Sequence, residues 1–420
     1  MNPLLNAGIL KQHLIDPVVC IRCNTCEATC PVGAITHDDR NYVVDANICN
    51  GCMACVSPCP TGSIDHWQPI AADQAFSLAQ QLTWDELPEL QDIASIVPSI
   101  VPNISADFAA DLAATPAPAH SAAPVNTSLS STIAPPSAAR PSTNLFTALK
   151  PARAKVTGNL RITDKTAASD THHVVLDFGD THFPVLEGQN IGITPPGLDA
   201  KGRAHMPRQY SIASPRDGER AGFNNLSITV KRVVDHEGRP HHGPASNYVC
   251  DLKVGDEIDV IGPFGSTFLM PNDPSANLLM ICTGTGSAPM RGFTEHVRRQ
   301  TAQGHTHGKL ILFFGARTPG ELPYFGPLTK LPPSLIDVNL AFSRAPNTAK
   351  QYVQDLMLNR ADAVATLLAE EHTYIYVCGL KGMEAGVLAA LEKVATQAGM
   401  DWAVLSQAMK AQGRLHLETY

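Results

Sequence analysis

Two runs of cysteines near the start of the chain have a spacing suited to one kind of prosthetic group. Each run reads CxxCxxCxxxCP. Together they hold eight of the chain's eleven cysteines, Cys20, Cys23, Cys26, Cys30, Cys49, Cys52, Cys55 and Cys59, with Pro31 and Pro60 behind them. A cubane iron–sulfur cluster needs one thiolate for each iron, and three cysteines separated by two residues can wrap a tight loop around three corners. The fourth ligand must come from elsewhere, so the runs predict two [4Fe-4S] clusters.

Three other uses of cysteine fit these runs poorly. A zinc site pairs two CxxC elements a dozen or more residues apart, and the third cysteine of each run would be a surplus ligand. Disulfides are typical of secreted chains, whereas the apolar stretch at the start is short, is interrupted by Lys11 and His13, and gives no secretory signal. Unligated core thiols would not need a duplicated spacing. Thiolate ligands indicate a reducing compartment, so we expect a cytoplasmic protein.

The bulk composition limits the class of protein. A chain of 420 residues is long enough for two to four domains. Its residues are 44% hydrophobic, and none of its apolar runs is long enough to span a bilayer, so we expect a soluble globular protein without a membrane partner. The 31 basic and 39 acidic residues give a modest net charge of −8, which does not suggest nucleic-acid binding.

The stretch 115–143 predicts a flexible linker. Of its 29 residues, Pro, Ala and Ser supply 19, and Arg140 is the only charged one. Such a composition buries too little apolar surface to offset the entropy of ordering, and proline favours extended conformers. The preceding stretch, 72–90, has apolar spacings that partly fit one or two short helices, for which covering the cluster domain is the simplest role.

From residue 145 onward the sequence predicts two more domains. After Pro271 strands alternate with helices around a glycine-rich loop, which predicts a parallel, doubly wound α/β sheet over 271–420. Before it, over 145–270, short β-rich runs between turn residues predict an antiparallel barrel. The expected barrel strands are 174–178, 190–194, 209–213, 226–234 and 257–262, and the expected sheet strands are 278–282, 310–315, 337–342 and 374–378.

Over 145–420 the chain resembles the plant-type ferredoxin–NADP reductase family. The motif RQYSIAS matches the family's flavin motif, so the resemblance implies that Arg208 pairs with the FAD pyrophosphate, Tyr210 covers the flavin and Ser211 lies near flavin N5. In GPASNY, the resemblance implies that Ala245 and Ser246 offer donors to the FAD phosphates, which small residues allow the backbone to approach.

Two further motifs follow predicted strands. TGTGSAP resembles the family's pyrophosphate loop, in which a glycine-rich turn places N–H groups against the dinucleotide. The sequence departs from the family before this loop, with Cys282 where glycine is common. In CGLKGME the resemblance implies that Cys378 lies beside the nicotinamide, although a buried core thiol is the commonest fate of cysteine. The residues expected to contact the nucleotide here are Thr283, Gly284, Thr285, Gly286 and Gly379.

The end of the chain and one basic loop extend the resemblance. Family members end in an aromatic residue that stacks on the flavin face as a lid, which implies this role for Tyr420. The resemblance also implies that Glu418 is the family's acidic residue near the site. A frayed terminus is the alternative for both residues. The loop after 337–342 resembles the NADPH-specific form, whereas NAD-selective sheets place an acidic residue there. The residues matched to the 2′-phosphate are Ser343, Arg344, Lys350 and Tyr352; a solvated basic loop is the alternative.

The cysteine region resembles the two-cluster bacterial ferredoxins, in which the last cysteine of each run crosses to the other cluster. Carried over, Cys59 completes the set begun by Cys20, Cys23 and Cys26, and Cys30 completes the other. The expected fold is thus multidomain: an α+β ferredoxin over 1–70, a linker over 71–144, an FAD-binding barrel over 145–270 and an NADP-binding α/β domain over 271–420.

This layout implies an NADPH-dependent oxidoreductase in which FAD converts a hydride into single electrons for two clusters. It is similar to that of the reductase components of aerobic benzoyl-CoA 2,3-epoxidase systems, which implies a separate di-iron oxygenase component as the partner. A reductase for another acceptor and a non-catalytic electron carrier stay open as alternatives, as does a homodimer. The chain has no ExxH pairs typical of a di-iron centre of its own.

Overall fold

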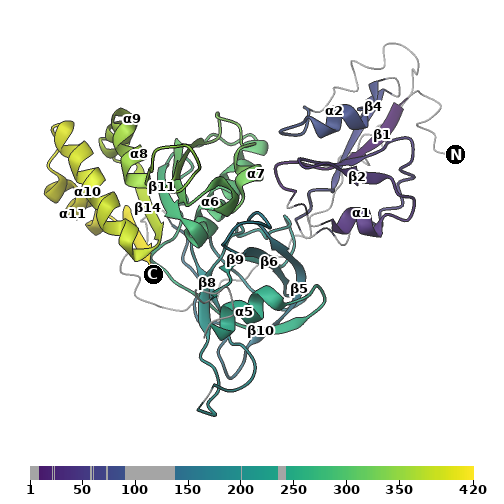
Figure 1. The fold of residues 1–420 in the computed structure, drawn as a ribbon, viewed down its shortest axis with the longest axis horizontal. Helices are drawn as coiled ribbons and strands as arrows, with labels where there is room; N and C mark the ends of the chain where they lie inside the picture. The colour runs from purple at the N-terminus through teal and green to yellow at the C-terminus, as the bar shows by residue number, and fades with distance from the viewer. Residues whose placement is uncertain are drawn as a thin grey trace. The chain divides into compact units, whose positions relative to one another are not determined.

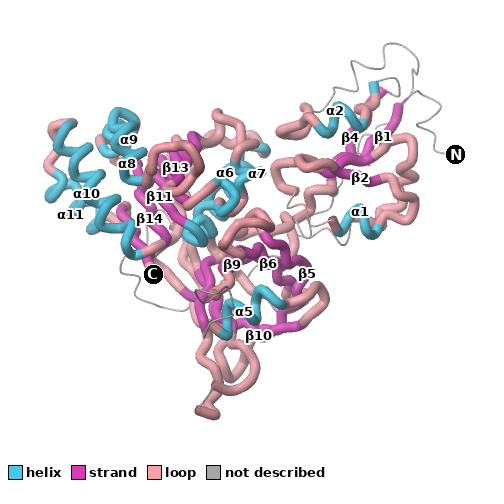
Figure 2. The backbone as a smooth tube through the Cα atoms, viewed as in Figure 1, coloured by secondary structure: helices cyan, strands magenta, loops and turns pink. Residues whose placement is uncertain are grey.

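The computed structural model describes residues 9–20, 22, 24–56, 59, 61–71, 74–89, 138–199, 201–234 and 243–420. The chain divides into two compact units, Met1–Leu129 and Ser130–Tyr420, named here the N-terminal and C-terminal units (Figures 1 and 2). The predicted linker over 115–143 lies largely outside the described residues. Among the described residues, no helix combines the length and apolar composition needed to cross a membrane.

The N-terminal unit is a small α+β domain, as predicted. Its two antiparallel pairs, β1 with β4 and β2 with β3, enclose a core that includes Leu14, Val44, Ile64 and Ile70. The bounds of its elements are β1 (Ile9–Leu14), α1 (Thr25–Thr29), β2 (Ile35–His37), β3 (Tyr42–Val44), β4 (His66–Ala71) and α2 (Leu78–Leu82).

Among the described residues of the stretch 72–90, one short helix forms, within the one or two that were expected. Helix α2 begins at a capping box, in which the Ser77 hydroxyl accepts from the Gln80 N–H and the Gln80 side chain accepts from the Ser77 N–H. The buried amide of Gln81 then pairs with both backbone groups of Val44 on β3, at 3.1 and 2.9 Å. These contacts fix the helix on the ferredoxin-like domain, as the simplest interpretation of the sequence predicted.

The first half of the C-terminal unit is an antiparallel barrel with strand order β8-β7-β10-β5-β6-β9. A bridge between Ile212 and Ile228 links the outer strands β8 and β9. Strand β5 alternates buried and exposed side chains over its first half, and the sequence analysis missed it. The bounds are β5 (Ala152–Arg161), β6 (Thr171–Asp177), β7 (Asn190–Ile193), β8 (Arg208–Ser211), β9 (Asn225–Lys231) and β10 (Glu257–Phe264), with helix α5 (Pro244–Asp251) between β9 and β10.

The second half is a parallel sheet with strand order β13-β12-β11-β14-β15. Its order reverses between β11 and β14, which is where open α/β sheets bind their ligands. The strands are β11 (Asn277–Thr283), β12 (Leu310–Ala316), β13 (Asp337–Phe342), β14 (Thr373–Gly379) and β15 (Leu415–Thr419), of which β15 was not predicted.

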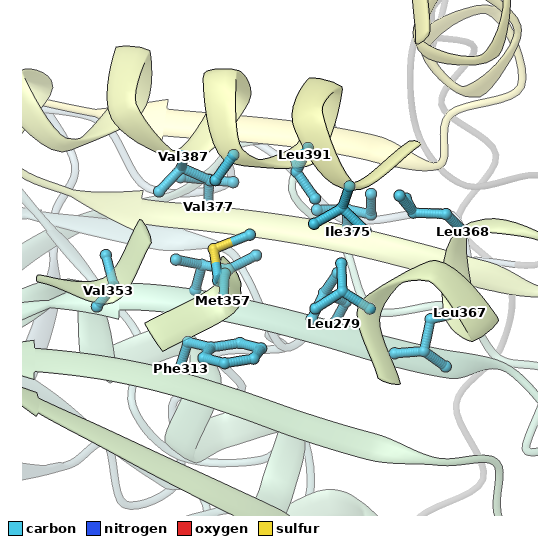
Figure 3. Packing of buried hydrophobic residues seen from close by; sticks show 14 of the residues in the cluster. Leu279, Phe313, Val353, Met357, Leu367, Leu368, Ile375, Val377, Val387 and Leu391 are labelled. Carbon is cyan, nitrogen blue, oxygen red and sulfur yellow. The ribbon is translucent and has the colours of Figure 1, made fainter. Parts of the chain in front are cut away.

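Helices cover both faces of this sheet, which confirms the doubly wound prediction. On one face, α6 packs Met290, Phe293 and Val297 against strand residues such as Tyr376. On the other, α8, α9 and α10 pack against a second set of strand side chains, as Figure 3 shows for Val387 and Leu391 of α10 beside Val377 and Ile375 of β14. The helix bounds are α6 (Ser287–Ala302), α7 (Phe325–Leu328), α8 (Val353–Asn359), α9 (Ala361–Leu368), α10 (Lys381–Gln397) and α11 (Trp402–Ala411).

A buried charged cluster joins the barrel to the sheet. Arg291 of α6 donates to both carboxylate oxygens of Glu219 at 2.7 Å, and the Ser227 hydroxyl donates to the same carboxylate at 2.6 Å. Nearby, His173 of β6 lies 2.8 Å from the Tyr324 hydroxyl. Burial of the Glu219 carboxyl raises its pKa, but the Arg291 guanidinium outweighs this effect and holds that pKa well below its usual range. Burial of the His173 ring lowers the pKa of His173. The cluster is therefore an ion pair beside a neutral imidazole.

Candidate active site

Two clefts open where the barrel meets the sheet. The barrel cleft has a volume of about 1020 Å³, and the nucleotide cleft has a volume of about 770 Å³. Ser169, Lys231 and Arg317 line both of them. Most of the residues predicted for FAD and NADPH line one of these clefts.

The flavin-motif residues share the end of one strand. Arg208, Tyr210 and Ser211 lie on β8 and line the barrel cleft. Arg208 is exposed there, whereas Tyr210 packs on the barrel core, and burial raises the pKa of its phenol. The strand therefore presents a cation, an aromatic ring and a hydroxyl to one cavity.

The motif GPASNY forms the start of α5. Ala245 and Ser246 are buried in its first turn, and both line the barrel cleft. The Ser246 hydroxyl already donates to the Gly243 carbonyl and accepts from the Val233 N–H, at 3.2 Å each. The start of a helix carries unpaired N–H groups, so this wall suits a phosphate.

The last strand brings an unpaired carboxylate oxygen to the barrel cleft. Glu418 lies beside Cys378 in the β14–β15 register, and its Oε1 accepts from the Asn190 amide at 3.0 Å. Its Oε2 is buried without a hydrogen-bond partner among the described residues. Burial raises the pKa of this carboxyl against the lowering effect of Asn190. An orphaned buried oxygen facing a cleft of this size indicates that another group completes the site.

Tyr420 lies at the mouth of the same cleft. The residue is 60% exposed, its hydroxyl lies 2.5 Å from the hydroxyl of Thr285, and partial burial raises the pKa of the phenol to about 12. Tyr420 N–H donates to the Gly379 carbonyl at 3.0 Å, and Lys381 N–H donates to the Tyr420 carbonyl at 3.0 Å. The terminal residue is thus held by its backbone rather than frayed.

Cys378, Gly286 and Gly379 line neither cleft and form the tight layer behind them. The Cys378 side chain is 1% exposed, and burial raises the pKa of its thiol. A Cβ at Gly286 would lie 2.2 Å from the Cys378 carbonyl oxygen. Gly379 has a φ of 139°, and a Cβ there would lie 2.5 Å from the Thr283 hydroxyl oxygen. Larger residues at these two positions would push the glycine-rich loop away from β14.

All four residues matched to the 2′-phosphate line the nucleotide cleft. Lys350 Nζ lies 4.7 Å from the centre of the Tyr352 ring. The backbone N–H of Arg344 donates to the backbone carbonyl of Arg317 at 2.7 Å, which fixes the Arg344 backbone. Ser343 directly follows strand β13. Thr283 and Gly284 form another part of the wall. The cleft therefore combines a glycine-rich loop with an aromatic ring and four cations, of which Arg344 and Lys350 are the two matched to the 2′-phosphate.

The cysteine runs lie together in the N-terminal unit. Cys20, Cys26, Cys55 and Cys59 are buried in one core, and Cys30 and Cys49 pack against it. The pKa of the Cys55 thiol is raised to about 11 by burial and, further, by its neighbours Cys30, Cys49 and Cys52. Cys23 and Pro60 lie outside the described residues.

Tyr42 lies near two thiols of the first cysteine run, those of Cys20 and Cys26. Its pKa is raised to about 12, first by burial and then by Glu27, Cys20 and Cys26. Among the described residues, no three acidic, histidine or cysteine side chains converge as ligands of a single metal ion.

The chain is similar to known proteins over two thirds of its length. The ferredoxin–NADP reductase from the cyanelle of Cyanophora paradoxa is 37% identical over 286 residues, which are 66% of this chain and 78% of that protein. The chain belongs to the ferredoxin–NADP reductase family. A second member, from Thermosynechococcus vestitus, is 35% identical over 288 residues, which are 66% of this chain and 75% of that protein.

Two family models match separate parts of this reductase. A 4Fe-4S dicluster domain matches residues 19–63, and an oxidoreductase NAD-binding domain matches residues 280–388. The ferredoxin–NADP+ reductase of Plasmodium falciparum, solved with 2′P-AMP, has the same fold, with a TM-score of 0.53, 23% identity, and coverage of 66% of this chain and 99% of that one. The protein is thus an NADPH-dependent flavoprotein oxidoreductase with an iron–sulfur ferredoxin domain ahead of the reductase fold.

The sequence analysis of this reductase missed the residues that join its two clefts. Lys231 ends strand β9, and Arg317 follows strand β12. Burial lowers the pKa of Lys231, and the neighbouring Arg317 lowers it further. The available signal was a cation at the end of one buried strand and directly after another, but nothing in the sequence indicated that the two strand ends meet.

Proposed function

We propose that this reductase takes hydride from NADPH at FAD and delivers single electrons through two [4Fe-4S] clusters to a separate oxygenase component. The observation that carries the proposal is the junction of the two clefts at Lys231 and Arg317. A dinucleotide bound by its adenosine end in the nucleotide cleft would reach the barrel cleft across this junction. FAD is the group suited to the barrel cleft, because it exchanges electrons both in pairs and singly.

The barrel cleft supplies the FAD contacts. Arg208 and the first turn of α5, with Ala245 and Ser246, would hold the pyrophosphate, and Tyr210 would cover the ring. Ser211 and Glu418 lie on neighbouring walls as candidates for moving or holding a proton near the reacting nitrogen.

The nucleotide cleft supplies the NADPH contacts. Arg344 and Lys350 would pair with the 2′-phosphate, with Ser343 donating a hydroxyl and Tyr352 stacking on adenine. The glycine-rich loop would bind the pyrophosphate and the nicotinamide ribose. Its residues are Thr283, Gly284, Thr285 and Gly286, with Gly379 beside them. Cys378 would support the nicotinamide site from behind the cleft as a neutral thiol, because its side chain is buried and burial disfavours its thiolate.

For the clusters we propose crossed ligation. Cys30 would complete the set of Cys49, Cys52 and Cys55, which its proximity to Cys55 supports. Cys59 would complete the set of Cys20, Cys23 and Cys26. Thiolate-bound clusters are consistent with the reducing cytoplasm.

For the acceptor we propose the di-iron epoxidase component that acts on benzoyl-CoA. The support is the layout of the chain, an iron–sulfur domain ahead of the reductase, which supplies one-electron carriers in the same polypeptide as the flavin site. A small-molecule substrate site for benzoyl-CoA is not required in this chain, since the oxygenase component would bind it.

The test is anaerobic mixing of the holoprotein with NADPH, followed by absorbance. We expect loss of the flavin bands and then of the broad iron–sulfur shoulder, in a protein with about eight irons per FAD. About four irons per FAD, or bound zinc, would contradict the two-cluster assignment.

The acceptor is tested separately. The purified epoxidase component with benzoyl-CoA should stimulate NADPH oxidation and oxygen uptake in equal amounts, whereas benzoyl-CoA alone should not. If the component leaves both rates unchanged while NADPH still reduces the clusters, the protein is a reductase for another acceptor.

A further inference from the structure

One carboxylate lines the nucleotide cleft. Among the described residues of its wall, Glu321 is the only acidic one, whereas the cations are Lys231, Arg317, Arg344 and Lys350. A dinucleotide phosphate carries several negative charges, and a carboxylate beside it weakens its binding through repulsion. Glu321 is therefore unfavourable for the proposed binding of NADPH, and the cations around it indicate what it does.

The backbone of Glu321 is fixed at the edge of the cleft. Glu321 ends the short turn η4 (Pro319–Glu321), and the Leu322 side chain that follows it is buried. The barrel holds the same turn, because the Asp164 N–H donates to the Gly320 carbonyl at 2.8 Å. The side chain of Glu321 is 12% exposed, so its carboxylate stays in the cleft rather than in bulk solvent.

The carboxylate lies beside the two cations at the junction of the clefts. Glu321 Oε2 is 4.0 Å from Arg317 Nη1, and among the described residues this carboxylate accepts no hydrogen bond. Lys231 is close enough for both charges to act on it, since burial lowers its pKa, Arg317 lowers it further and Glu321 raises it. The ion pair with Arg317 is loose and half of the arginine side chain is exposed, so the pair can be broken at small cost.

We propose that Glu321 is a positioning residue that competes with the nucleotide pyrophosphate for Arg317, pairing with this arginine when no nucleotide is bound and giving it up when one binds. The proposal rests on the proposed binding of NADPH across the junction. Arg317 and Lys231 line both clefts, whereas Arg344 and Lys350 line only the nucleotide cleft. The pyrophosphate, rather than the 2′-phosphate, is therefore the group that meets the junction.

The competition acts on the release of the product. A nucleotide that leaves exchanges its pyrophosphate for the Glu321 carboxylate at Arg317, so this cation is not left without an anion beside it. Glu321 thus stabilises the protein without nucleotide relative to the complex, which weakens binding and raises the dissociation rate. NADH and NADPH share the pyrophosphate, so the competition leaves the preference that we propose for Arg344 and Lys350 unchanged.

The test compares Glu321→Gln, Glu321→Asp, Arg317→Gln and the Glu321→Gln/Arg317→Gln double variant in the FAD-loaded protein. Calorimetry gives the affinity for NADP+, for ADP-ribose, which has the pyrophosphate but no 2′-phosphate, and for 2′-AMP, which has the 2′-phosphate but no pyrophosphate. Stopped-flow displacement gives the dissociation rate of NADP+. The matched control is Glu257→Gln, which removes a carboxylate from the exposed ion pair with Arg153 on the barrel.

We expect Glu321→Gln to bind NADP+ and ADP-ribose about three- to tenfold more tightly and to release NADP+ more slowly by a similar factor. Glu321→Asp keeps the charge and should retain most of the wild-type behaviour, and Glu257→Gln should match the wild type. Arg317→Gln should weaken binding of both probes. On that background Glu321→Gln should have a much smaller effect, because the cation for which the two anions compete is gone.

Three results would overturn the competition. Unchanged affinity of Glu321→Gln for ADP-ribose would show that the carboxylate does not oppose the pyrophosphate. An effect of full size on the Arg317→Gln background would show that Glu321 repels the nucleotide directly. A gain in affinity for 2′-AMP would place the competition at the other phosphate. Failure of the wild type to bind both NADP+ and ADP-ribose would instead refute the proposed nucleotide site.

Discussion

In the nucleotide cleft, Arg344 and Lys350 are the cations that we propose for the 2′-phosphate. We expect Arg344→Glu to weaken NADPH binding by about 2–4 kcal/mol, because it removes a charge-assisted pair and adds repulsion. NADH, which lacks the 2′-phosphate, should bind as before. Measurement of kcat/KM for both nucleotides tests this, with Lys410→Glu on the exposed end of α11 as a control for the same change in net charge. Retention of the NADPH preference by the Arg344 variant would contradict the assignment.

His416 provides a test that depends on pH. Its ring stacks on Tyr376 at 4.6 Å, its Nε2 has no hydrogen-bond partner among the described residues, and burial lowers its pKa from 6.5 to about 4. Because the folded pKa lies below the ordinary value, the unfolded chain binds more protons between pH 6.5 and about 4. The stability of the C-terminal unit should fall as pH is lowered through this window, with His416 contributing up to about 3 kcal/mol of the loss.

The matched variant is His416→Phe, which keeps the stacked ring but cannot be protonated. We expect its free energy of unfolding in urea to depend less steeply on pH than that of the wild type between pH 6.5 and 4.5. Parallel curves for the two proteins would show that His416 does not titrate in this way.

At the level of elements, the two cysteine loops exchange one ligand each in our assignment. Cys30→Ser should leave the same spectrum of reduced protein as Cys52→Ser, because both remove a ligand from one cluster. Cys59→Ser should match Cys20→Ser in the same way. Electron paramagnetic resonance of the reduced variants gives the comparison. If Cys30→Ser instead matches Cys20→Ser, each run holds its own cluster.

The sequence predicted the elements whose side chains follow a clear pattern. The strand–glycine loop–helix unit of β11 and α6 is one example, in which α6 begins at Ser287 directly after the glycine-rich turn. Strand β5 was missed because Arg153, Lys155 and Thr157 alternate with small residues rather than with large apolar ones. Strand β15 was missed because five residues at a chain end carry little periodicity and depend on pairing with β14.

The residues of the candidate site could be predicted where they belong to a short sequence motif. Arg208, Ser211 and the loop after β13 came from motifs, and the structure brings them to the two clefts. The hydrogen bonds Asn190–Glu418 and Thr285–Tyr420 join residues more than a hundred positions apart in the chain. Local spacing carries no information about such contacts, since they depend on how the barrel and the sheet meet.

For the whole molecule, charge is divided unevenly along the chain. Residues 1–89 contain three Lys or Arg and ten Asp or Glu, a net charge of −7, whereas residues 138–420 contain 28 and 26, a net charge of +2. The acidic part is the iron–sulfur domain from which electrons leave in our proposal. A basic acceptor should therefore associate faster than an acidic one at low salt.

This predicts opposite salt dependences for two artificial acceptors. With NADPH as donor, reduction of basic cytochrome c should slow as salt rises from about 0.05 to 0.5 M, because screening removes the attraction. Reduction of the anion ferricyanide should slow less or accelerate. Stopped-flow rates at constant pH provide the measurement, and identical trends for both acceptors would mean that electrons leave from elsewhere.

The Glu219–Arg291 ion pair with His173 and Tyr324 also limits how this protein could be recombined with its relatives. Its acidic and imidazole groups come from the barrel, while its guanidinium and phenol come from the nucleotide sheet. A chimera that joins this barrel to another reductase's sheet near residue 270 would bury Glu219 without a counterion unless that sheet also carries the arginine, at a cost of about 3–5 kcal/mol. A chimera joined near residue 138 should therefore lose much less stability. It would attach a foreign ferredoxin while keeping this barrel and this sheet together.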